Sequence, residues 1–126
     1  MDPNLLLRVL SESIQYELEP FGIKIILIEP GAVGSTFWKN IKIAKSSSNA
    51  NSPYAQFMSQ TMKAYKEMEQ NAINISEVTK TILDAVTSDY PQLRYLVGED
   101  ATKAIEAKKN MSDEEFGDLM KKQFGM

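Results

Sequence analysis

Two residue types that carry much of enzyme chemistry are missing from this chain of 126 residues, which contains no cysteine and no histidine. Thiol nucleophiles, imidazole general bases and the usual zinc ligands are therefore excluded, and we expect no metal site. The sequence also shows neither a signal-peptide pattern nor a long apolar span. A soluble cytoplasmic protein without a membrane segment is the default expectation.

Charge of one sign is not concentrated anywhere in the chain. Lysine and arginine number 14 and aspartate and glutamate 17, which gives a net charge of −3. Because the basic residues are scattered among acidic ones, the chain lacks the electrostatic footprint of a nucleic-acid-binding protein. Its length and its hydrophobic content of 43% fit a single globular domain, residues 1–126.

The stretch at residues 23–37 organises the chain. It opens with a nearly continuous β-branched run, Ile23 to Ile28, which is typical of a strand covered on both faces in a parallel α/β sheet. Pro30 ends the run because it donates no ladder hydrogen bond, and Gly31 and Gly34 allow a sharp turn or a close approach. Ligands of open α/β sheets bind beyond the carboxyl ends of the strands. A binding loop is therefore one interpretation, and a plain solvated turn is the other.

Residues 1–22 are predicted to form a helix. Asp2 is a candidate N-cap, Pro3 suits the first helical position, and Pro20 with Gly22 ends the helix. Two apolar stripes recur at helical spacing, so we expect this helix to lie between its own sheet and a partner. The first stripe comprises Leu6, Leu7, Leu10, Ile14, Leu18 and Phe21, and the second comprises Leu5, Val9 and Tyr16.

Residues 38–90 are predicted to form a helical lobe. A polar run, Lys45 to Pro53, is expected to be a surface loop or the hinge of a lid. The helix that follows, about Pro53 to Gln70, carries methionine and aromatic residues on one side, which form either plain core or an adaptable wall over an apolar substrate. Ser76 is expected to cap a further helix that turns four apolar side chains inward: Val78, Ile82, Leu83 and Val86.

A second strand and the C-terminal helices complete the predicted fold. Within residues 91–98, the run Arg94 to Val97 is predicted to be a short strand closed by Gly98. Residues 99–126 should form a short helix and then a last helix that begins with a capping box, Ser112 with Glu115. We expect the two strands to be parallel neighbours joined through the helical lobe. The predicted class is α/β, with two parallel strands and about five helices.

A longer pattern resembles a known family, although the glycines form no G-x-G-x-x-G turn. Residues 10–24, LSESIQYELEPFGIK, run into residues 28–33, IEPGAV, and residues 95–98, YLVG, follow later. This succession resembles the C-terminal half of a short-chain dehydrogenase/reductase, over nearly the whole chain from about Leu5. The resemblance implies a partial Rossmann-like, doubly wound fold and NAD or NADP as the cofactor.

The site that the resemblance implies lies on the Pro-Gly loop. In that family, the segment after Pro-Gly lies along the nicotinamide ring and meets its carboxamide with backbone groups and a hydroxyl. The matching cofactor-binding positions in this chain are Pro30, Gly31, Val33, Ser35 and Thr36. Threonine is usual at the hydroxyl position, so Ser35 departs from the family pattern but keeps the donor. The helix from about Pro53 to Gln70 matches the family's variable substrate lobe.

The resemblance also implies what this chain does not carry. The family's glycine-rich turn lies in its N-terminal half, and its catalytic tyrosine and lysine are spaced Y-x-x-x-K. Counting back along the matching helix puts the lysine position at Asn4 and the tyrosine before Met1. No catalytic residue is therefore assigned, and binding of NAD or NADP by this chain alone is expected to be weak.

Three classes of function stay open from the sequence. The chain is a fragment or separate half of an NAD(P)-dependent oxidoreductase, inactive alone; a non-catalytic remnant that binds a ligand or partner; or an oligomerisation module. An unpaired strand edge and a helix with two apolar stripes both favour association with another chain. We expect a homo-oligomer, most simply a dimer, with a missing N-terminal half as the other candidate partner and neither nucleic acid nor a membrane.

Overall fold

The order of helices and strands is the one that the sequence predicts. The computed structural model describes residues 3–45, 49 and 51–124. In chain order, the elements are α1 (Pro3–Leu18), the 3-10 turn η1 (Glu19–Phe21), β1 (Leu27–Pro30), the 3-10 turn η2 (Trp38–Asn40), α2 (Ala55–Gln70), α3 (Ile75–Thr87), β2 (Arg94–Val97), α4 (Glu99–Asn110) and α5 (Asp113–Gln123). Two strands and five α-helices within the described residues confirm the predicted α/β class.

The two strands are parallel neighbours, as predicted. Leu27 lies opposite Arg94 and Pro30 opposite Val97, so the ladder runs the length of both strands. The Leu27 amide donates to the Leu93 carbonyl over 2.7 Å, just before β2 begins. The apolar run upstream, residues 23–26, is not part of β1, because β2 offers only four residues to pair with. The strand predicted from Ile23 to Ile28 therefore starts four residues too early and ends two residues before the observed end at Pro30.

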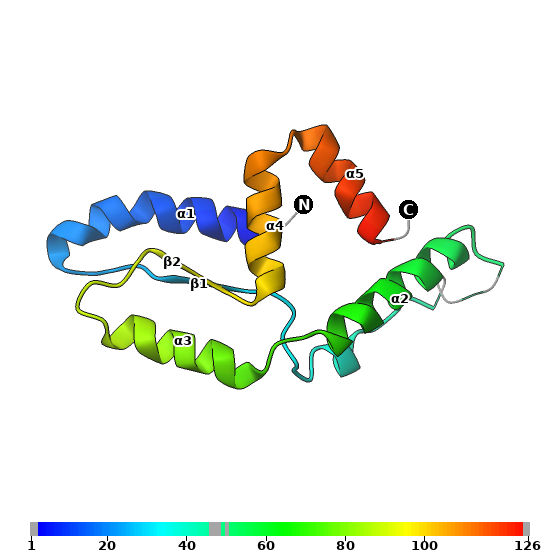
Figure 1. The fold of residues 1–126 in the computed structure, drawn as a ribbon, viewed down its shortest axis with the longest axis horizontal. Helices are drawn as coiled ribbons and strands as arrows, with labels where there is room; N and C mark the ends of the chain where they lie inside the picture. The colour runs from blue at the N-terminus through cyan, green and yellow to red at the C-terminus, as the bar shows by residue number, and fades with distance from the viewer. Residues whose placement is uncertain (1–2, 46–48, 50, 125–126) are drawn as a thin grey trace.

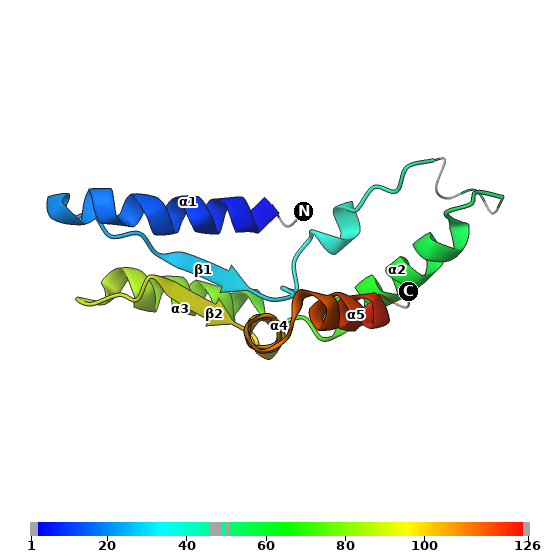
Figure 2. The same cartoon turned by 90° about the horizontal axis from the view of Figure 1, so that it is seen from above.

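The strand pair lies between two helices. In Figure 1, α1 is on one side of the strands and α3 is on the other; in Figure 2, α1 again lies to one side of the strands, whereas α3 overlaps β2. Helix α4 begins two residues after β2, and α2 and α5 lie beyond the carboxyl ends of the strands. Helices α2, α4 and α5 thus lie around the end of the sheet at which ligands of open α/β sheets bind.

Helix α1 turns a polar face to the strands. Ser11 is buried, and Arg8 and Glu12 beside it are half-buried. Most of the residues in the two predicted apolar stripes are exposed instead, namely Leu6, Leu7, Val9, Leu10, Tyr16 and Phe21. The predicted N-cap Asp2 and the side chain of Leu5 lie outside the described residues. The polar face faces inward because Arg8 and Glu12 form ion pairs with side chains of the two strands.

Helix α3 buries a small residue and exposes larger ones. Ala85 has no exposed surface and Val78 is half-buried, whereas Leu83 is 60% exposed and Val86 is 65% exposed. The prediction of an inward face is thus right for Val78 and wrong for Ile82, Leu83 and Val86, all of which are exposed. The N-cap is Asn74 and not Ser76, because the Asn74 side chain accepts a hydrogen bond from the Ser76 amide over 2.9 Å.

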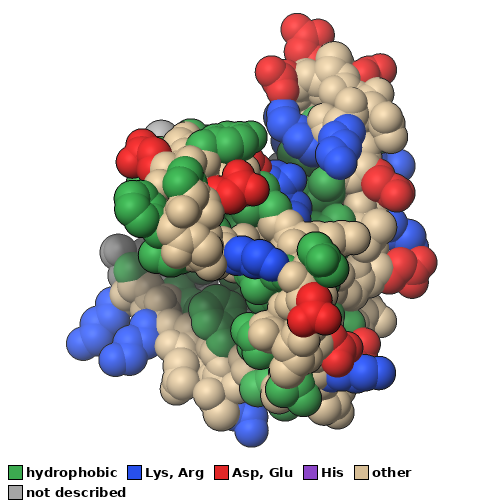
Figure 3. Space-filling model, turned by 90° about the vertical axis from the view of Figure 1, so that its left-hand side faces the viewer, with side chains coloured by type: hydrophobic (Ala, Val, Ile, Leu, Met, Phe, Trp, Pro, Cys, Tyr) green, Lys and Arg blue, Asp and Glu red, His purple; other side chains and the backbone are tan. Residues whose placement is uncertain are grey.

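The buried interior of this chain is small. Among the described residues, the buried hydrophobic side chains are Leu27, Ala64, Ala85 and Val97. The chain exposes 9858 Å², whereas a compact monomer of this length exposes roughly 6,800 Å². Figure 3 shows hydrophobic side chains reaching the surface over much of one face, mixed with acidic and basic ones. A large apolar surface is therefore available for a partner.

Candidate functional site

The Pro30–Gly31 loop lies where the two strands end and is held by both. The Gly31 amide donates to the Val97 carbonyl of β2 over 2.9 Å. The next amide, that of Ala32, donates to Oδ2 of Asp100 in the first turn of α4 over 2.7 Å. A strand end and a helix start therefore fix two consecutive amides of the loop.

The second half of the loop pairs with the linker between α2 and α3. The Ile73 amide donates to the Ala32 carbonyl over 2.8 Å, and the Gly34 amide donates to the Ile73 carbonyl over 2.9 Å. These bonds form an isolated parallel bridge between Val33 and Ile73. The loop is consequently tied to three segments that are far from it in the sequence, and the amides of Gly31, Ala32 and Gly34 are bonded within the chain.

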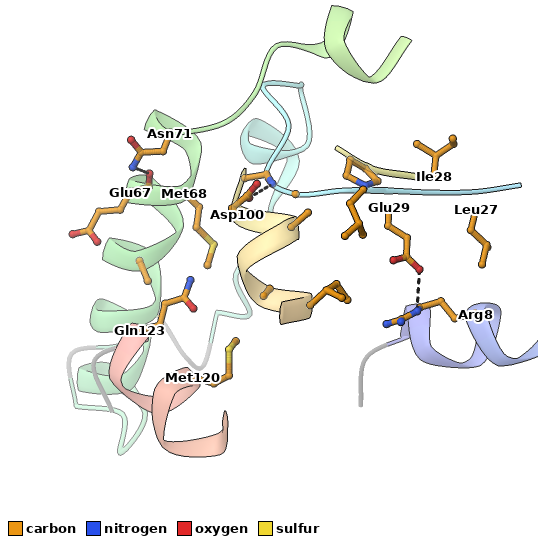
Figure 4. A pocket seen from close by; sticks show the side chains of 18 of the residues that line it. Arg8, Leu27, Ile28, Glu29, Glu67, Met68, Asn71, Asp100, Met120 and Gln123 are labelled. Atoms are coloured by element: carbon orange, nitrogen blue, oxygen red, sulfur yellow. Dashed lines mark hydrogen bonds and ion pairs between the residues drawn. The ribbon is translucent and has the colours of Figure 1, made fainter. Parts of the chain in front are cut away.

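An apolar cavity of about 820 Å³ opens beside the loop (Figure 4). Its walls come from β1, from the start of α1 and from α2, α4 and α5. Most of the lining is apolar: Leu7, Leu27, Ile28, Pro30, Ala32, Ala64, Met68, Leu96, Ala101, Ala104, Ile105 and Met120. A concave apolar site of this size with a few polar groups is the common form of a small-molecule site.

The arginines at the cavity wall are paired with carboxylates, whereas Glu67 and Asp100 line the same cavity outside these ion pairs. Nε of Arg8 lies 2.9 Å from Oε1 of Glu29, and Nε of Arg94 lies 3.3 Å from the same oxygen. Arg94 also bonds to the Glu12 carboxylate. On the opposite wall, the amide side chain of Gln123 is one of the polar groups that line the cavity (Figure 4). The arrangement suits an uncharged, largely apolar ligand with room for one or two polar contacts.

The methionine and aromatic residues of α2 divide between the two roles that the sequence left open. Met68 lines the cavity, next to the buried Ala64. Tyr65 instead packs against the ring of Phe124, edge to face, with the ring centroids 6.4 Å apart. Tyr54 and Phe57, near the start of the helix, are exposed. The packing interpretation therefore holds for Tyr65, while Met68 lies at the cavity, where the substrate-wall interpretation stays a prediction.

The five positions predicted to bind a cofactor do not share one hollow. Pro30 and Gly31 line the apolar cavity, whereas Ser35 and Thr36 line a smaller hollow of about 630 Å³ beside Lys39 and Glu69. Val33 lies between the two groups, in the bridge to Ile73. Oγ of Ser35 accepts a hydrogen bond from the Phe37 amide over 3.3 Å, which leaves its hydroxyl proton to donate.

Asp100 is the residue that the sequence analysis missed at this site. It follows β2 by three residues, and the carboxyl ends of parallel strands meet at one edge, so its position after Gly98 was the available signal. Its neighbour Glu99 points to Lys103, with 2.7 Å between Oε1 and Nζ. The hydrogen bond and the charge of Lys103 hold the pKa of the exposed Glu99 carboxyl below its ordinary value. Glu99 thus serves α4, while Asp100 serves the loop.

Comparison with known proteins relates the chain to oxidoreductases. It is 32% identical over 92 residues to the probable short-chain type dehydrogenase/reductase VdlC of Helicobacter pylori, covering 73% of this chain and 33% of that protein. It is 24% identical over 120 residues to an uncharacterized oxidoreductase of Schizosaccharomyces pombe, covering 93% and 48% of the two chains. The NADPH-dependent 3-dehydrocapnine reductase of Ornithobacterium rhinotracheale is 28% identical over 88 residues, covering 68% and 30%.

These relatives are all oxidoreductases. The similarity supports the resemblance to short-chain dehydrogenases/reductases over most of this chain, which spans a third to a half of the length of the relatives. No protein-family model matches the chain. Within the described residues, none of the helices has the length and hydropathy needed to cross a membrane. That same part of the chain holds no cluster of three acidic side chains suited to a metal ion.

Proposed function

We propose that this chain is the nicotinamide-side half of an NAD(P)-dependent short-chain oxidoreductase of the cytoplasm, and that it is inactive alone. The observation that carries the proposal is the Pro30–Gly31 loop, fixed at the carboxyl ends of two parallel strands beside an apolar cavity. The names of the relatives support a redox activity. Because those relatives are two to three times as long, the pyrophosphate site and the proton-handling residues would belong to the other half of the enzyme.

In this proposal, Pro30, Gly31, Val33, Ser35 and Thr36 face the nicotinamide end of NAD or NADP, which supplies or accepts the hydride. The donor set limits how they can do so, because the amides of Gly31, Ala32 and Gly34 are already bonded within the chain. The hydroxyls of Ser35 and Thr36 are therefore the groups that fit a carboxamide. Pro30 and Gly31, which line the apolar cavity, are the positions against which the ring would lie.

The apolar cavity is the proposed substrate side of the same site. Met68 of α2 and Met120 of α5 both line it (Figure 4), and their flexible side chains suit a hydrocarbon frame. Arg8 is the cation of the wall and is paired with Glu29. Glu67 and Asp100 add negative charge, so the wall does not suit an acidic substrate. An uncharged ketone or alcohol on an apolar frame is the substrate class that fits.

The exposed apolar surface favours a second candidate function. The chain exposes roughly 3,000 Å² more than a compact monomer of its length. If each of two chains buried about half of that surplus, the interface would have the total area that obligate partners bury. A non-catalytic module that binds a partner, most simply a second copy of itself, is therefore the alternative.

A hydride-transfer assay and a binding titration separate these candidates. We expect the purified chain to show no turnover with NADH or NADPH and a panel of apolar ketones and aldehydes, because orientation and acid–base catalysis are both lost. Millimolar NADPH should shift the backbone NMR signals of residues 30–36, and Ser35→Ala should weaken that shift. Turnover that follows the protein and disappears in Ser35→Ala contradicts inactivity alone. Unchanged loop signals at saturating cofactor favour the binding module.

A further inference from the structure

The carboxylate of Asp100 occupies the space above Gly31. A Cβ atom built on Gly31 would lie 1.9 Å from Oδ1 and 2.2 Å from Cγ of Asp100, well inside any allowed contact. Gly31 does not have a positive φ, unlike Gly22 and Gly98. The need for glycine at this position is therefore the close approach of Asp100 and not a left-handed backbone.

The same carboxylate holds the next residue of the loop by a hydrogen bond. Oδ2 of Asp100 accepts from the Ala32 amide over 2.7 Å, a short distance typical of a charge-assisted bond. Gly98 opens the other side, since a Cβ there would lie 2.7 Å from Oδ1 of Asp100. The carboxyl group thus sits between two glycines, with one oxygen committed to the loop.

The position of Asp100 is itself set by a rigid element. It is the second residue of α4, where the amides of the first turn favour a negative charge. Ala101 and Ala104 of the same helix line the apolar cavity. One helix therefore carries both a wall of the cavity and the group that fixes the turn beside it.

We propose that Asp100 is the positioning residue of this site, the group that holds the Pro30–Ala32 turn at a fixed distance and orientation from the cavity. The inference rests on the proposed function in that the turn is taken as the surface for the nicotinamide. Its structural content, the coupling of Asp100 to Gly31, is independent of any cofactor. Asp100 acts through the loop and takes no part in proton transfer.

A double-mutant cycle in the full 126-residue chain tests the coupling. Gly31→Ala should lower the ratio of folded to unfolded protein, measured by urea unfolding, at least about tenfold, because the added methyl group collides with the carboxylate. In an Asp100→Ala background the same change should alter that ratio by less than about threefold. Gly117→Ala in α5, where nothing lies within 4 Å of an added Cβ, is the matched control in both backgrounds.

An equal cost of Gly31→Ala in the two backgrounds overturns the proposal. If Gly31→Ala alone does not fold, folding of the double variant Gly31→Ala/Asp100→Ala is the supporting result. If neither folds, the NMR spectrum of Asp100→Asn decides. In Asp100→Asn, the chemical shift of the Ala32 amide proton should move upfield. In Glu99→Gln, one residue earlier, that chemical shift should stay unchanged. An Ala32 signal that Asp100→Asn does not move counts against the proposal.

A cofactor titration ties the inference to function without confusing the two. The shift that millimolar NADPH produces in the signals of residues 30–36 should fall at least about threefold in Asp100→Asn and stay unchanged in Glu99→Gln. A wild-type chain that shows no shift speaks against the proposed function. The double-mutant cycle of Gly31 and Asp100 would still test whether the two residues are coupled. A full shift in Asp100→Asn removes Asp100 from the positioning role.

Discussion

At the scale of single residues, the carboxylate of Glu29 joins three elements of the fold. It lies on β1, and both Arg8 of α1 and Arg94 of β2 approach its Oε1 atom. The side chain of Glu29 is 18% exposed and those of the two arginines 26%, so solvent screens the three charges only in part. The polar inner face of α1 is held on the strands largely by this group and by the contact of Arg94 with Glu12.

Replacing Glu29 by glutamine should therefore destabilise the fold. The amide keeps the shape but leaves two half-buried arginines without their shared counter-charge, which costs about 1–3 kcal/mol of unfolding free energy. The change in unfolding free energy can be measured by urea unfolding monitored with circular dichroism. Glu17→Gln on the exposed side of α1 is the control, with an expected change within about 0.5 kcal/mol. Equal effects of the two variants would mean that the ion pairs contribute nothing.

The N-terminus of α5 gives a prediction about pH. The Ser112 amide donates to the Glu115 carboxylate over 2.8 Å, and this bond, with one to the Ser112 side chain, holds the pKa of Glu115 below its ordinary value. A lowered pKa in the folded state means that the contribution of Glu115 to the helix is present above roughly 4.3, the ordinary glutamate value. It is lost as the pH falls through the lowered pKa.

The pKa of the Glu115 carboxyl group can be measured by carbon-detected NMR titration. We expect its midpoint below that of an unstructured glutamate, with loss of α5 helicity on the acid side of the midpoint. In Ser112→Ala the midpoint should return toward the ordinary value, while Glu114→Gln in the same turn should leave it in place. A Glu115 midpoint at or above the ordinary value contradicts the capping box.

At the scale of elements, the sequence predicts those features whose causes are local. The boundaries of α2 and β2 and the capping box of α5 follow from neighbouring residues, and the structure has them where the pattern places them. The inward faces of α1 and α3 depend on which side meets the strands. Both helices carry apolar residues on more than one side, and the ion pairs of Arg8 and the small size of Ala85 decide the outcome.

In the candidate site, too, features with a local cause could be predicted from the sequence and long-range contacts could not. The Pro30–Gly31 loop could be predicted, because proline and glycine after an apolar run mark a strand end wherever they occur. The position of Asp100 just after β2 marks it as a candidate, but its contact with Ala32 could not be predicted, since that contact joins residues that are 68 positions apart. Nothing local to residues 98–100 distinguishes a carboxylate that caps its own helix from one that reaches another loop.

The face of α3 that packs on the strands can be tested by placing the same charge on both sides. Ala85→Glu buries a carboxylate without a partner and should prevent α3 from docking, with a loss of at least about 2 kcal/mol. Leu83→Glu on the exposed side should change the stability by about 0.5 kcal/mol or less. Urea unfolding compares the two variants. A larger loss from Leu83→Glu would show that the face predicted from the sequence is the buried one after all.

At the scale of the whole molecule, the exposed surface dominates. Four hydrophobic side chains of the described residues are buried, and β1 pairs on one edge only, with β2. An unpaired edge and the exposed leucines of α1 are both costly to leave in water. Because the inner face of α1 is polar, the apolar side of that helix faces away from the strands and has no partner within the described part of this chain. This arrangement adds to the apolar surface that another chain could cover.

We therefore expect the chain to form a homodimer at micromolar concentration through the outer face of α1, where Leu6 is 65% and Leu10 is 61% exposed. A two-fold interface buries the copy of each of these side chains from both subunits, and burying one side chain contributes roughly 1.5–3 kcal/mol to the free energy of association. Sedimentation equilibrium should accordingly show a dimer for the wild type and a monomer for the double variant Leu6→Glu/Leu10→Glu. Leu83→Glu, which adds one charge to the exposed face of α3, should leave the dimer intact. A wild-type chain that stays monomeric over the whole concentration range and melts cooperatively contradicts the prediction. Loss of the dimer in Leu83→Glu alone would move the interface to α3.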